Sequence, residues 1–146
     1  MTELTTAEVE ALNAALDDEY HAYATYDQVV RDLGEVRPFI NIRDAEARHI
    51  EALRSLFDRH GVPVPSNGWL GKVKRYQRLR DACADAVDAE IANAALYDRL
   101  LGSTDREDLL TVFGNLREAS QERHLPAFRR CLQAGRGGRH ASRLFG

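Results

Sequence analysis

The chain has 146 residues, and its 20 basic and 23 acidic side chains give a formal net charge of −3. This length fits a single domain with a proper core, and the charge gives no electrostatic reason to expect nucleic acid as a partner. No apolar run approaches the roughly 20 residues that span a bilayer. Residues 1–10 contain no basic residue, so they do not resemble a secretory signal. We therefore expect a cytoplasmic protein that binds neither nucleic acid nor membrane.

Four segments have the spacing of apolar residues that is typical of amphipathic helices, and no stretch alternates as a strand would. Thr5 and Glu8 form a capping box ahead of the first segment, Pro38 suits the first turn of the second, and Asp105 can cap the fourth. The expected helices cover residues 6–33, 38–60, 72 or 76 to 101, and 105–133.

The connections between these helices differ in length. Short turns join the first helix to the second and the third to the fourth, whereas the middle connection contains a loop over residues 61–69. Short turns make neighbouring helices antiparallel. We therefore expect an all-α four-helix bundle over residues 1–134, built from two helical hairpins joined by a longer link, and a flexible tail over residues 135–146. The spacing leaves open whether the link crosses the bundle or connects a plain up-and-down arrangement.

Each predicted helix carries an ionisable residue near the middle of its apolar stripe. These residues are Glu19 in the first helix, Glu46 and His49 in the second, Glu90 in the third and His124 in the fourth. Mid-helix positions meet at one level in an antiparallel bundle, so the five side chains should cluster in the core. Three unpaired carboxylates in an apolar interior would cost many kcal/mol, and a pair of iron or manganese ions would compensate them with a suitable set of ligands. The spacing of Glu46 and His49 also places both donors on one side of their helix.

A structural polar core is the alternative interpretation, in which arginine side chains pair with the buried carboxylates. Arg48, Arg117 and Arg123 are the candidates for that pairing. We favour metal binding because the stripes of all four helices are interrupted at one level. The side chains expected to support the ligands are Asn93, Gln121, Tyr23 and Tyr26.

Residues 39–53, FINIRDAEARHIEAL, resemble the signature of a prokaryotic family of uncharacterised ferritin-like domain proteins that is related to the rubrerythrins. Residues 89–93 (AEIAN) and 112–128 (VFGNLREASQERHLPAF) are similar to further parts of that family, and the resemblance extends over most of the chain. It implies a ferritin-like fold and metal binding, but no established reaction.

One position departs from the di-iron pattern of ferritins and rubrerythrins, which has a second Glu-x-x-His on the last helix. The residue three before His124 is Gln121, and Glu122 points about 100° away around an α-helix. Three carboxylates against two divalent ions leave a net charge of about +1, so a single ion or a labile second ion stays open. Pro126 frees the carbonyl group of Glu122 and is expected to disturb the helix beside the site.

The expected function is that of a di-iron or di-manganese oxidoreductase that acts on peroxide or dioxygen, or that oxidises Fe(II). The chain has no CxxC pair for a rubredoxin-type iron site, so an enzyme of this kind would need an external reductant. The alternative is a non-catalytic metal-binding or structural bundle that acts through a homodimer or a partner protein. For the protein itself we expect a homodimer. Cys83 and Cys131 are expected to be reduced, buried thiols, and Trp69 to cover the end of the bundle or contact a second copy.

Overall fold

The computed structural model describes residues 3–134, so the expected tail lies outside the described part of the chain. The elements are α1 (Thr6–Leu33), α2 (Phe39–Arg59), α3 (Leu79–Leu100), α4 (Glu107–Glu118) and a π-helical segment, η1 (Ala119–His124), after which α-helix continues over residues 125–134. No strand occurs among residues 3–134. The helices pack as a bundle, and the predicted all-α, four-helix fold is confirmed.

The predicted capping box at the start of α1 is present. Thr5 Oγ1 accepts from the Glu8 amide at 3.1 Å, and Glu8 Oε1 accepts from the Thr5 amide at 2.8 Å. Glu8 is buried and also accepts from the Thr104 hydroxyl group and from Arg106 Nε at 3.1 Å. The start of α1 is thereby tied to the turn before α4. That turn places Arg106, and not the expected Asp105, at the cap of α4.

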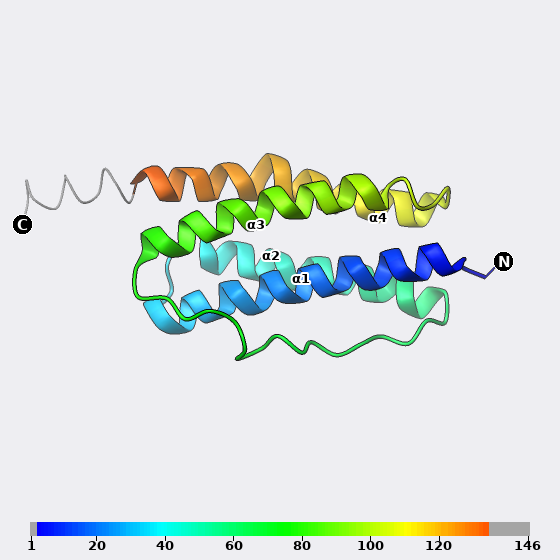
Figure 1. Cartoon of the computed structure of the whole chain (residues 1–146), viewed down its shortest axis with the longest axis horizontal. Helices are drawn as coiled ribbons and strands as arrows, with labels where there is room; N and C mark the ends of the chain where they lie inside the picture. Colours follow the sequence, from blue (N-terminus) through cyan, green and yellow to red (C-terminus); the bar gives the residue numbers. More distant parts are fainter. Residues whose placement is uncertain (1–2, 135–146) are drawn as a thin grey trace, which may run out of the picture.

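The two hairpins α1–α2 and α3–α4 are arranged as predicted, and the link between them crosses the whole bundle (Figure 1). Residues 60–78 run along the outside of α1 from one end of the molecule to the other, so that α3 runs parallel to α2. An up-and-down arrangement is therefore excluded. The predicted third helix begins later than expected, at Leu79, because the preceding residues are extended along α1.

Polar contacts hold the link against α1 along its length. The Tyr20 hydroxyl group donates to the Pro65 carbonyl at 2.7 Å, and Asp32 accepts from Arg75 Nε and the Tyr76 amide, each at 2.8 Å. Trp69 lies between these two places in the link, and its Nε1 donates to Asp17 of α1 at 3.0 Å. Trp69 thus lies beside α1, and the expectation that it covers the end of the bundle is wrong.

The core consists of two apolar clusters. The first is built around Leu12, Leu16, Leu53, Phe57, Tyr97, Leu109 and Phe113. The second contains Tyr26, Val29, Phe39, Ile42, Cys83, Ala86 and Phe128. Along α1 the first cluster reaches Tyr20 and the second begins at Tyr26, so apolar side chains pack on both sides of the level expected for the acidic residues.

Cys83 and Cys131 form a disulfide bond, which corrects the expectation of reduced thiols. Cys83 is fully buried in α3, and Cys131 is partly buried in the helix that follows η1. The two residues are 48 positions apart in the sequence, but α3 and the last helix pack side by side. Separation along the chain was therefore no guide to their distance in space.

Candidate metal centre

The five ionisable residues predicted to share the core do come together. Ligand atoms of Glu19, Glu46 and His49 lie within 4.8 Å of one another, and so do those of Glu46, Glu90 and His124. Glu46 belongs to both groups, so the arrangement is one cluster with a shared carboxylate at its centre. The three carboxylates come from α1, α2 and α3, and no more than 2% of each residue is exposed.

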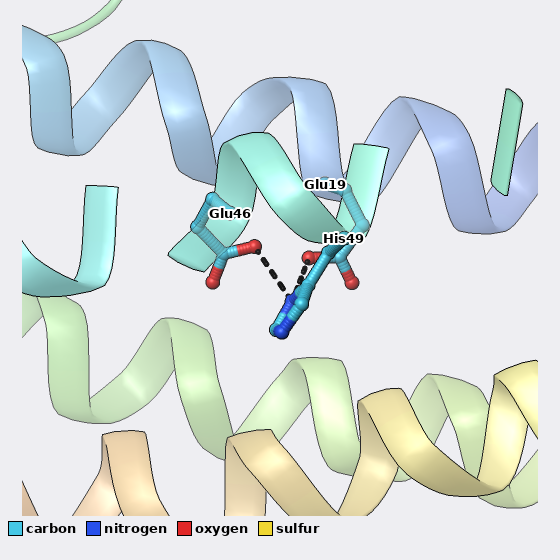
Figure 2. A group of neighbouring side chains, drawn as sticks. All are labelled: Glu19, Glu46 and His49. Carbon is cyan, nitrogen blue, oxygen red and sulfur yellow. Dashed lines mark hydrogen bonds and ion pairs between the residues drawn. The ribbon is translucent and has the colours of Figure 1, made fainter. Parts of the chain in front are cut away.

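The imidazole groups lie between pairs of carboxylates. His49 Nδ1 is 3.4 Å from Glu19 Oε1 and 3.4 Å from Glu46 Oε2, and Figure 2 shows both carboxylates directed toward this ring. His124 Nδ1 is 3.3 Å from one oxygen of Glu46 and 3.3 Å from one oxygen of Glu90. The two rings are nearly parallel, with centroids 5.4 Å apart. Each histidine therefore serves one group, and Glu46 faces both.

Two buried atoms of this cluster have no hydrogen-bond partner among the described residues. They are Glu46 Oε2 and His124 Nδ1. The nearby charged atoms are at ion-pair distance but lack hydrogen-bond geometry. Buried polar atoms are nearly always partnered in proteins, and carboxylate oxygen and imidazole nitrogen are good ligands for iron and manganese. The residues present thus fit a bound divalent ion in each group.

Hydrogen bonds from neighbouring side chains fix the outer carboxylates. Glu19 Oε2 accepts from the Tyr97 hydroxyl group at 2.5 Å and from Asn93 Nδ2 at 3.3 Å. Glu90 Oε2 accepts from the Tyr26 hydroxyl group at 2.5 Å, and Glu90 Oε1 accepts from Ser120 at 2.8 Å. Asn93 and Tyr26, both expected to support the ligands, therefore form hydrogen bonds to two of the candidate carboxylates.

The other two expected supporting residues lie differently. Tyr23 is only partly buried, packs against the first apolar cluster and forms no hydrogen bond with the carboxylates among residues 3–134. Tyr97 was not among the expected supporting residues, but its hydroxyl group donates a hydrogen bond to Glu19. Its place on the same stripe as Glu90 and Asn93 was the available signal.

Gln121 is exposed, whereas Ser120 is almost fully buried against Glu90. The reason is the π-helical geometry of η1, which has more residues per turn than an α-helix. Ser120, four residues before His124, therefore shares its face, and the residue three before it turns outward. The position expected for a sixth ligand is thus replaced by a serine that hydrogen-bonds Glu90. The π-helical turns end just before Pro126, which cannot donate to the Glu122 carbonyl.

The electrostatics of the cluster follow from three carboxyl groups buried together. Burial and the neighbouring Glu46 raise the pKa of Glu19 to about 7. Burial also acts to raise the pKa of Glu46, but contacts with Glu19, His124 and His49 outweigh it and lower that pKa. Burial would lower the pKa values of the histidines, yet their carboxylate neighbours raise that of His49 to about 10 and that of His124 to about 9. At neutral pH both histidines of the metal-free protein therefore carry protons that offset the carboxylates, and a metal cation that binds here must displace these protons.

The arginines proposed for a structural polar core lie elsewhere. Arg117 pairs with Asp98, Arg123 is 4.0 Å from Glu118, and Arg48 is exposed. No arginine or lysine side chain among residues 3–134 forms an ion pair with the three central carboxylates. These basic residues therefore do not neutralise the buried carboxylates.

A cavity of about 350 Å³ reaches the cluster from the side covered by the link. Its lining includes Tyr26, Glu90 and Asn93 next to the cluster, and Lys74 and Tyr76 from the link. A larger groove of about 850 Å³ between α2 and α4 contains none of the five candidate ligands. Of these two, only the smaller cavity reaches the cluster, and its size suits small molecules.

Together, the fold and the site define an all-α four-helix bundle whose buried groups of glutamate and histidine could hold metal ions. The chain is similar in structure to hypothetical protein MJ0754 from Methanococcus jannaschii, known from a crystal structure, with a TM-score of 0.80 and 24% sequence identity over 91% of this chain and 83% of the other. This similarity supports the fold. No protein-family model and no curated protein matches the sequence.

Among the described residues, none of the helices combines the length and the apolar character that a membrane span requires.

Proposed function

We propose that this protein is a ferritin-like metalloprotein that binds two iron or manganese ions and reduces peroxide or dioxygen. The observation that carries the proposal is the convergence of three buried carboxylates and two imidazoles into two groups that share Glu46. A purely structural core would not need two unpartnered ligand atoms at its centre.

Each group of residues would hold one ion. Glu19, Glu46 and His49 form one ligand set, and Glu46, Glu90 and His124 form the other, so Glu46 would bridge. When bound in the reduced state, such an ion pair supplies electrons for the reduction of peroxide or dioxygen. Three carboxylates and two neutral imidazoles leave ligand positions for water or substrate.

The surrounding residues suit this chemistry in three ways. Tyr97 and Asn93 hold Glu19, while Tyr26 and Ser120 hold Glu90, so that hydrogen bonds orient both outer carboxylates. The two apolar clusters exclude bulk water along the bundle axis. The cavity beside Glu90 and Asn93 offers a small oxidant a route to the cluster. A cytoplasmic location and a homodimer belong to the same proposal.

Elemental analysis of protein purified without chelators tests the metal site. We expect about two ions per chain in the wild type, following the two ligand groups, and a loss of both in Glu46→Ala because both groups share this carboxylate. Glu51→Ala is the matched control, since Glu51 is exposed on the same helix, and it should keep the wild-type content. Equal metal content in all three proteins would refute the proposed ligands.

Peroxide consumption separates an enzyme from a non-catalytic metal-binding bundle. Protein loaded anaerobically with Fe(II) should consume peroxide in proportion to its bound iron, and Glu46→Ala should not exceed buffer containing the same iron. Loaded protein that leaves peroxide and dioxygen unchanged would support the non-catalytic alternative, in which the bundle acts as a homodimer or with a partner.

A further inference from the structure

The disulfide bond lies on the two helices that bring Glu90 and His124 to the cluster. Cys83 precedes Glu90 by seven residues in α3, and Cys131 follows His124 by seven residues. Because these helices are antiparallel, both sulfur atoms lie toward the same end of the bundle. At a rise of 1.5 Å per residue, each cysteine is about 10 Å along the helix from its candidate ligand.

Packed aromatic side chains fill the space between the disulfide and the cluster. Cys83 belongs to the same apolar cluster as Tyr26 and Phe128, and Cys131 packs against that cluster. The rings of Tyr26 and Phe128 have centroids 5.1 Å apart. Tyr26 also donates its hydroxyl hydrogen to Glu90 at 2.5 Å. The disulfide and the candidate metal centre are therefore connected through one continuous region of packed protein.

The two cysteine residues differ in their exposure to solvent. Cys83 is completely buried, whereas Cys131 is partly exposed near the end of the described chain. Thiol–disulfide exchange requires that an attacking thiolate reach one sulfur atom. An external thiol can thus approach Cys131, and Cys83 would then be released as a thiol next to the aromatic side chains.

We propose that Cys83 and Cys131 are a redox-active pair that supplies two electrons for peroxide reduction at the metal centre. This inference rests on the proposed function and extends it to a thiol-dependent peroxidase. In forming the S–S bond, the two thiols give up two protons and two electrons; hydrogen peroxide takes up two protons and two electrons as its O–O bond breaks, and yields two water molecules. An external thiol or dithiol then reduces the disulfide and is itself oxidised. The expected external reductant is accordingly of the thiol class.

Counting thiols tests this pair directly. Protein reduced with a dithiol, freed of it anaerobically and loaded with Fe(II) receives hydrogen peroxide in steps, and the remaining thiols are measured with a thiol reagent and by mass. We expect both thiols to disappear, at least about 10-fold faster in loaded protein than in metal-free protein or in Glu46→Ala, because the proposed reaction passes their electrons to peroxide at the metal centre. Thiols that survive, or that disappear equally fast without metal, would overturn the proposal.

The peroxide stoichiometry provides a second measurement. Two Fe(II) ions and one dithiol hold four electrons, so the loaded wild type should consume about two equivalents of peroxide, and Cys83→Ser/Cys131→Ser about one. If the double variant consumes its equivalent while the wild type keeps its thiols, this inference fails and the proposed function stands. If neither protein binds iron or consumes peroxide, both fail. The wild-type thiol count remains decisive should the double variant fold poorly.

Discussion

Tyrosine hydroxyl groups hold the outer carboxylates of the cluster, one at each. Burial, together with the nearby carboxylates, raises the pKa values of Tyr26 and Tyr97 well above the usual value, so both remain protonated donors. Tyr97 donates to Glu19 and Tyr26 to Glu90. Each tyrosine thus fixes the orientation of one candidate ligand.

Removing either hydroxyl group should therefore weaken metal binding without removing a ligand. We expect Tyr97→Phe and Tyr26→Phe each to lower metal affinity by roughly 10–100-fold, the usual effect of losing a hydrogen bond to a ligand. Competition titration with a metal chelator measures this change. Tyr20→Phe is the control, because Tyr20 donates to the link and not to the cluster; affinities equal to this control would contradict the assigned role.

Glu8, in the first turn of α1, makes the free energy of unfolding depend on pH. Hydrogen bonds from Thr104 and Thr5, with Arg106 nearby, outweigh burial and lower the pKa of Glu8 from 4.5 to about 2. A lowered pKa in the folded state means that the carboxylate stabilises the protein above its unfolded pKa, and that this contribution is lost as the pH falls through the folded pKa.

Glu8→Gln should accordingly reduce the free energy of unfolding by about 1–3 kcal/mol near neutral pH, the usual cost of losing charged hydrogen bonds. The difference from wild type should shrink between pH 4.5 and about 2. Urea unfolding at several pH values measures it, with the exposed Glu10→Gln as control. A difference that does not vary with pH would argue against a charged Glu8.

At the scale of elements, the π-helical segment η1 decides which side chains join the cluster. The five candidate ligands could be predicted from sequence because each interrupts an apolar stripe, and a stripe defines one face of a helix. The same reasoning assumed 3.6 residues per turn up to His124, and so it placed Gln121 inside. A π-helical turn has no comparable sequence signal, which is why Ser120 was not chosen over its neighbour.

Gln121→Glu distinguishes these two geometries. An α-helix here would complete the second Glu-x-x-His and add a sixth ligand. Because η1 turns this position toward solvent, we expect unchanged metal stoichiometry and affinity in Gln121→Glu. Ser120→Ala, at the buried position, should instead weaken binding. Elemental analysis with chelator competition measures both variants, and tighter binding by Gln121→Glu would indicate that η1 rearranges when metal binds.

The path of the link and the disulfide bond could not be predicted from the sequence, because both depend on contacts between residues that are far apart along the chain. Loop length allowed residues 60–78 to cross the bundle but did not require it. The contacts that hold the link, such as Tyr20 with Pro65 and Asp32 with Tyr76, join residues about 45 positions apart. Such pairings become visible only once the helices are placed in space.

For the whole molecule, the cluster couples metal binding to stability. Three carboxylates buried at the centre of the bundle oppose folding unless they are compensated. An ion that binds only the folded state stabilises it by about 2.7 kcal/mol at one hundred times the dissociation constant, which corresponds to roughly 5–10 °C in melting temperature for a chain of this size.

Chelator treatment removes both proposed ions, so it should lower the melting temperature of the metal-loaded wild type by at least the amount for one ion, roughly 5–10 °C. Calorimetry of loaded and chelated protein measures the shift, and Glu46→Ala should show none because it lacks the shared carboxylate. A melting temperature that is unchanged by chelation in the wild type would mean that the carboxyl groups are compensated by protons alone.

The external course of the link has one more consequence. Every candidate ligand lies within one of the two hairpins, three on α1 and α2 and two on α3 and η1, while the chain between them passes around the outside. A break in the exposed part of the link would leave both hairpins with intact helices, but neither hairpin with all five candidate ligands. The ions would then hold two separate polypeptides together, and the two hairpins would assemble only when metal is present.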